Sequence, residues 1–184
     1  MASPSTGRTA ALSLQLSLAH RDLRRRLDGL RTDLGRPRRP GGDDNGLLTH
    51  CLAFCTALTN HHQGEDTGLF AQLLRERPDL APTIGRLVED HGLITHILTR
   101  VRELADRAAD IAAADASAGG ATGSALEPIG RELDGLAAIM DSHFAYEERA
   151  IGAALDAGVS DDGWSEPVLR FGPPRSPAPQ SPTP

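Results

Sequence analysis

Apolar residues recur at every third or fourth position in four segments of the chain, which is the spacing of one buried face of an α-helix. Runs rich in glycine and proline separate these segments at Gly35–Gly46, around Pro78 and Pro82, and at Ala114–Ser124. No segment shows the alternation of a half-buried strand, and short connections place consecutive helices antiparallel. The pattern therefore predicts an all-α fold, an up-down-up-down antiparallel four-helix bundle. The four apolar stripes run over Leu12–Leu34, Leu47–Leu73, Ile84–Ala105 and Leu126–Ile151.

The same pattern sets the limits of the folded part. We predict a disordered N-terminus over residues 1–9, one bundle over residues 10–156 and a Pro- and Ser-rich tail over residues 157–184. The tail ends in PPRSPAPQSPTP, a composition that cannot form a packed core and is typical of disorder. Trp164 and Phe171 could hold the start of the tail against the bundle.

Composition agrees with a helical protein and excludes several classes. Hydrophobic residues make up 39% of the chain but aromatic residues only 3%, and leucine and alanine, both good helix formers, dominate. The net charge of −6 argues against a nucleic-acid surface. We find no secretory signal and no apolar run long enough for a membrane span. Cys51 and Cys55 are expected to be small core residues of a cytoplasmic protein, with a redox pair as the alternative.

Polar side chains interrupt the apolar stripes at positions that face the predicted core. Burying such a group without a partner costs roughly 1–3 kcal/mol, so six of them would threaten the stability of a small bundle. At a rise of about 1.5 Å per residue, counting from each turn places all six in one layer midway along the bundle. They can therefore satisfy one another or share a ligand. The six residues are His20, His61, Glu65, His91, His143 and Glu147.

Two of the four helices carry the motif HxxxE, which sets an imidazole and a carboxylate one turn apart on the same face. These are His61–Glu65 and His143–Glu147, and such ligands suit iron, manganese or zinc. Each residue alone could be a hydrogen-bonded core histidine or part of a surface ion pair. The conjunction of six at one depth favours a metal centre in which two carboxylates bridge two ions.

The motifs HHQGEDTGLF at His61–Phe70, EDHGL at Glu89–Leu93 and HFAYEERAI at His143–Ile151 resemble the hemerythrin-like (HHE cation-binding) family, as does HRDL at His20–Leu23. The likeness covers about Ala10 to Leu155. It implies two non-haem iron ions, bridged by an oxo or hydroxo group and held by the six residues. It also implies that the partner is O₂, peroxide or another small diatomic ligand.

The chain departs from the oxygen-carrying members of that family. They have HxxxH on the third helix, but Leu87 and Thr95 stand four residues from His91, and His96 lies on another face. They end in HxxxxD rather than HxxxE. One coordination position then stays open, which favours reaction with O₂ or peroxide over carriage. The alternative is an O₂-, NO- or redox-sensing or O₂-binding module without turnover, so enzyme activity stays undecided.

Three further residues were weighed as contributors to the centre. His62 is expected to look toward a neighbouring helix or solvent, because it lies 100° around the helix from His61. His50 is too far along its helix to join the centre. Tyr146 is next to Glu147 and could support a ligand, although partial burial explains it better.

Overall fold

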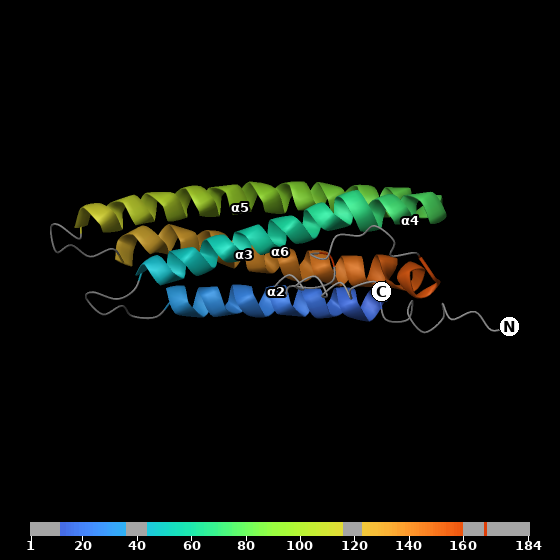
Figure 1. Ribbon diagram of the computed structural model, residues 1–184, viewed down its shortest axis with the longest axis horizontal. Coiled ribbons are helices and arrows are strands. Elements are labelled where there is room, and N and C mark those ends of the chain that lie inside the picture. Colours follow the sequence, from blue (N-terminus) through green and yellow to red (C-terminus); the bar gives the residue numbers. More distant parts are fainter. Residues whose placement is uncertain (1–11, 36–43, 116–122, 160–167, 169–184) are drawn as a thin grey trace, which may run out of the picture.

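A computed structural model describes residues 12–35, 44–115, 123–159 and 168 (Figure 1). Within these ranges every regular element is a helix, which confirms the predicted all-α class. The predicted loops Gly35–Gly46 and Ala114–Ser124 lie largely between the described ranges, and residues 1–9, Trp164 and Phe171 lie outside them. The elements are α2 (Leu12–Leu34), α3 (Asp44–Gly64), the π-helix η1 (Glu65–Leu69), α4 (Phe70–Glu76), the 3₁₀ turn η2 (Pro78–Leu80), α5 (Ala81–Asp115) and α6 (Gly123–Asp156).

The long helices lie side by side in one elongated bundle (Figure 1). Helix α2 contacts α3 and α6, and α5 also contacts α3 and α6, so each has two helical neighbours. Contacts along α2 and α6 run in opposite directions: Ser13 Oγ bonds Asp156 at one end and Arg31 pairs with Asp134 toward the other. These neighbours are therefore antiparallel.

The turn between α4 and α5 follows from two prolines. Helix α4 ends at Glu76, and Pro78 begins the 3₁₀ turn at the position where its missing N–H costs no helical hydrogen bond. Pro82 lies in the first turn of α5, where the same reasoning applies. The region predicted as a turn is thus a compact corner.

Leucines of the predicted stripes fill the interior, and Leu23, Leu58, Leu98 and Leu133 are fully buried. Each such side chain contributes roughly 1.5–3 kcal/mol relative to leaving it exposed. The buried apolar residues form two clusters, one around Leu27, Leu98 and Ile129, the other around Leu16, Leu87 and Leu155. Polar residues lie at the boundary between them.

Two further observations concern the outer parts of the chain. Val159 and Val168, beyond the last long helix, are 4% and 0% exposed and belong to the second apolar cluster. Cys51 and Cys55 are buried free thiols in the first cluster, as predicted for core residues. No helix in the described ranges is long and apolar enough to cross a membrane.

Candidate metal centre

Helices α2, α3, α5 and α6 and the π-helix η1 bring all six predicted residues into one buried cluster, and none is more than 3% exposed. On one side, His61 Nε2 lies 3.0 Å from Glu65 Oε1. His20 Nε2 lies 3.7 Å from the same oxygen and 3.4 Å from Glu147 Oε2. His20 and His61, contributed by α2 and α3, form what we call the first histidine group.

The second side is built by α5 and α6. His91 Nε2 and His143 Nε2 are 3.1 Å apart, so their coordinating nitrogens converge on one place. His91 Nε2 is 3.6 Å from Glu65 Oε2, and His143 Nε2 is 3.7 Å from Glu147 Oε2. Glu65 therefore has one oxygen toward each side, and Glu147 Oε2 lies between His20 and His143. This is the arrangement expected of carboxylates that bridge two ions.

His62 joins the second side: of the two predicted directions, toward a neighbouring helix or toward solvent, it takes the first. It is 3% exposed, and its ring stacks on that of His91 with centroids 4.0 Å apart and planes 9° apart. Helix α3 packs against both α2 and α5, so two successive residues can face the interior in different directions. His61 thus meets His20, with ring centroids 5.1 Å apart, while His62 meets His91. We call His62, His91 and His143 the second histidine group, and both groups with Glu65 and Glu147 the polar layer.

Three carboxylates outside the polar layer contact the Nδ1 atoms of its histidines. The Nδ1 atom of His20 lies 2.8 Å from Glu148, and that of His91 lies 2.8 Å from Asp66. His143 Nδ1 lies 3.3 Å from Asp90. An N–H donated from Nδ1 leaves Nε2 free to bind a metal and fixes the ring's orientation. Each of these carboxylates is adjacent in the sequence to a residue of the polar layer. The sequence did not predict their role, because each one contacts a histidine on a different helix.

The backbone is irregular where Glu65 enters the layer. Residues Glu65–Leu69 form a π-helix in which the Phe70 N–H bonds the Glu65 carbonyl, one residue further than in an α-helix. Such single π turns occur often at functional sites. The extra residue in this turn rotates the residues that follow it around the helix axis. Beyond Glu65, the side chains of Leu69, Phe70 and Leu73 are all buried.

The buried charges of His20, Glu65 and Glu147 shift one another's pKa values. Burial would lower the pKa of His20, but the bond to Glu148 and the charges of Glu65 and Glu147 raise it to about 9. Burial would raise the pKa of Glu65, yet the neighbouring histidines, His61 foremost, hold it well below its usual range. Burial and the charge of Glu65 raise the pKa of Glu147 well above its usual value. Without metal, Glu65 thus favours the ionised form and Glu147 the protonated form.

The second histidine group has the opposite tendency. Burial lowers the pKa of His143 to about 4, with the nearby His91 adding to the effect and Asp90 opposing it. Burial and the neighbouring His91 also lower the pKa of His62 well below its usual value. Both rings are neutral at pH 7, which is the form that binds a metal.

The donor atoms fit a metal better than they fit one another. Within the described ranges, His20 Nε2, both ring nitrogens of His62 and all carboxylate oxygens of Glu65 and Glu147 are buried without a hydrogen bond. Leaving such atoms unsatisfied costs roughly 1–3 kcal/mol each. Two sets have coordinating atoms within 4.8 Å of one another: His62, His91 and His143, and His20, His61 and Glu65. Imidazole and carboxylate are borderline and hard donors that suit iron, manganese or zinc.

Aromatic side chains pack against the layer. Phe144 is fully buried and stacks on His20, with centroids 3.9 Å apart and planes 6° apart. The guanidinium of Arg24 lies over the Phe144 ring, 5.1 Å from its centroid. Phe70 stacks near His91 with centroids 5.6 Å apart. These rings help to keep water from the histidines.

Apart from His62, the residues that the sequence did not predict as ligands lie outside the polar layer. His96 is exposed, as expected of a residue on another face. Leu87 is buried in the second apolar cluster, and Thr95 is exposed, so neither adds a donor. Tyr146 is half-buried, with Arg149 over its ring at 5.7 Å.

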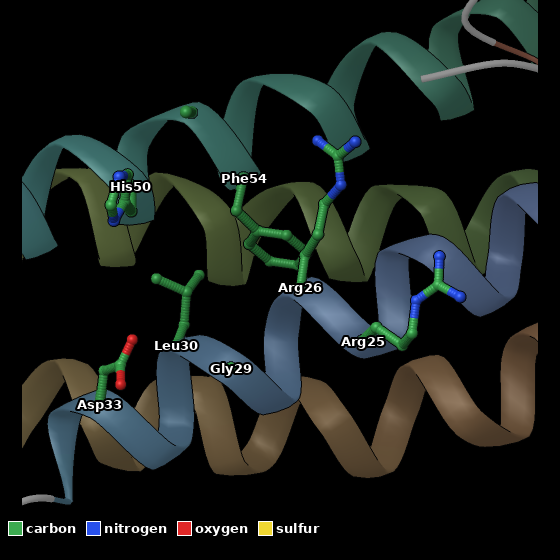
Figure 2. A pocket seen from close by; sticks show the side chains of 8 residues that line it. Arg25, Arg26, Gly29, Leu30, Asp33, His50 and Phe54 are labelled. Carbon is green, nitrogen blue, oxygen red and sulfur yellow. The ribbon is translucent and has the colours of Figure 1, made fainter. Parts of the chain in front are cut away.

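A groove of about 370 Å³ lies between α2 and α3 (Figure 2). Exposed His50 lines it together with Phe54 and Leu30. Arg25 and Arg26 also line it, and both pair with Asp22. No residue of the polar layer lines this groove.

Comparison with known families gives one match. The family model described as hemerythrin HHE cation-binding domain matches residues 14–156, which span the whole bundle. No curated protein and no solved structure matches the chain.

Proposed function

Because the chain belongs to the hemerythrin HHE cation-binding domain family, we propose that its up-down-up-down bundle holds two non-haem iron ions in the polar layer. One observation carries the proposal. Glu65 Oε1 lies 3.0 Å from His61 Nε2, and Glu65 Oε2 lies 3.6 Å from His91 Nε2. One carboxylate therefore faces both histidine groups. A single ion would leave one group without a partner.

Each residue then has a defined role. His20 and His61 would hold one ion, His91 and His143 the other, and Glu65 and Glu147 both. The pair of ions would supply redox chemistry with O₂, peroxide or another small diatomic ligand. Asp66, Asp90 and Glu148 would keep the imidazoles oriented, and the apolar clusters on both sides would limit the access of water.

The function we favour is reaction with O₂ or peroxide. Helix α5 contributes His91 but no second imidazole, since Leu87 is apolar and Thr95 points outward. A centre with fewer neutral nitrogen donors has a larger share of anionic ligands, which favours the ferric state electrostatically. The partner is then a small molecule rather than a nucleic acid, and a cytoplasmic location stays a prediction from sequence.

A sensing or O₂-binding module without turnover is the second candidate. The position of His62 beside His91 and His143 favours it, because a third imidazole would replace the one that α5 lacks. The groove in Figure 2 is lined by residues outside the polar layer.

The decisive experiment combines metal analysis with reactivity. Protein purified without chelator should contain close to two irons per chain, and the oxidised form should consume hydrogen peroxide. Glu147→Ala should abolish consumption, whereas the exposed His96→Ala should leave it unchanged. One iron per chain, or tightly held zinc, would refute the di-iron centre. Reversible O₂ uptake by the reduced protein without peroxide consumption would establish the second candidate instead.

A further inference from the structure

We propose that His62 is a metal ligand, the third imidazole of the second histidine group, so that the chain offers seven donor side chains rather than six. The inference rests on the proposed dimetal centre. It concerns a residue that the spacing of HxxxE does not select, because His62 follows His61 directly in the sequence.

The position of the ring is the first argument. Coordinating atoms of His62, His91 and His143 lie within 4.8 Å of one another, close enough for one ion to be held by all three. The His62 ring stacks on His91 at 4.0 Å and meets His143 edge-on, with centroids 5.4 Å apart. Three rings from α3, α5 and α6 thus surround one place.

The lack of any other partner is the second argument. His62 is 3% exposed, and in the described part of the chain neither of its ring nitrogens makes a hydrogen bond. His91 and His143 differ, because Asp66 and Asp90 hold their Nδ1 atoms. A histidine used only for packing normally has at least one hydrogen bond when buried. A metal ion bound to one ring nitrogen of His62 would give that nitrogen a partner.

The number of imidazole donors is the third argument. Without His62, each histidine group has two imidazoles and the layer has four. With it, the second group has three, and the fold makes up on α3 the donor that Leu87 and Thr95 fail to give on α5. The added donor is neutral, so the layer gains no negative charge, and ligation by His62 weakens the electrostatic preference for the ferric state and favours the second candidate function.

The test separates ligation from packing with a variant that preserves the stack. His62→Phe keeps an aromatic ring against His91 but has no nitrogen donor, and His62→Gln serves as the second variant if the first does not fold. His91→Gln removes an accepted member of the same group, and His96→Gln replaces an exposed histidine as the matched control. Helix content by circular dichroism shows which variants are folded.

Full-length protein freed of metal with a chelator is titrated with Co²⁺, whose visible spectrum reports the donors around it. We expect two ions per chain in the parent protein and in His96→Gln. In His62→Phe and His91→Gln the affinity for one ion should fall at least tenfold and its absorption bands should shift, while the other ion binds as before. Parent-like affinity and spectrum in folded His62→Phe or His62→Gln would overturn the role of His62. Failure of the parent to bind a second ion would instead overturn the dimetal centre.

Discussion

Metal uptake should release the proton that the polar layer holds on His20. The ring lies 2.8 Å from Glu148 and within 3.4–3.7 Å of Glu147 and Glu65, and its pKa is raised to about 9. At pH 8 a group with a pKa of about 9 is protonated in a ratio of about 10 to 1, or about 0.9 proton. An imidazole with the ordinary value of about 6.5 would hold only about 0.03 proton there.

Coordination through Nε2 requires the neutral ring, so metal binding should displace nearly the whole proton. Glu147, whose pKa is raised well above its usual value, adds to the release while it is protonated. The His20 contribution should fall to about half at pH 9 and to about a tenth at pH 10. Metal affinity should therefore rise with pH up to about 9 and level off above it.

Calorimetric titration with Zn²⁺ in buffers of different ionisation enthalpy measures this release directly. Glu148→Gln should reduce the release at pH 8, because it removes the strongest group that raises the pKa of His20. Asp79→Asn, a change at an exposed carboxylate paired with Arg77, should leave it unchanged. Release near zero at pH 8 in the parent protein would show that His20 is neutral before metal binds, contrary to our reasoning.

Three more outcomes are expected. The pKa of His143 is lowered to about 4, so its contribution to the stability of the metal-free protein is fully present above pH 6.5 and falls by up to about 3 kcal/mol between pH 6.5 and 4, as urea unfolding over that range would show; a flat profile between pH 6.5 and 4 would contradict this. Asp66→Asn should weaken metal binding roughly 10–100-fold by loosening His91, whereas Asp79→Asn should not, as competition with a chelator would measure. Truncation after Gly158 should leave the metal content unchanged, since all the proposed ligands lie before it, but should lower the melting temperature because Val168 is buried; loss of metal would mean that the tail closes the centre.

The apolar period and the polar residues that break it were sufficient to predict the helices and the layer. Both signals are local: residues three or four apart share a helix face whatever the helix packs against. His61 and Glu65 could be paired on that ground alone, as could His143 and Glu147. Their depth along antiparallel helices followed from the constant rise per residue, and the structure does bring all six residues together.

The partners across the layer depended on tertiary structure. A sequence gives the direction of His62 relative to His61 but not which neighbour occupies that direction, and here α5 places His91 against it. Asp66 beside His91 and Glu148 beside His20 required the relative rotation of two helices, which local spacing does not specify. The π turn at Glu65 also has no periodic signature, since one added residue changes the helix face only beyond it. Helix formation is a local free-energy balance, but the number and orientation of donors is set by packing between helices, and only the folded chain determines it.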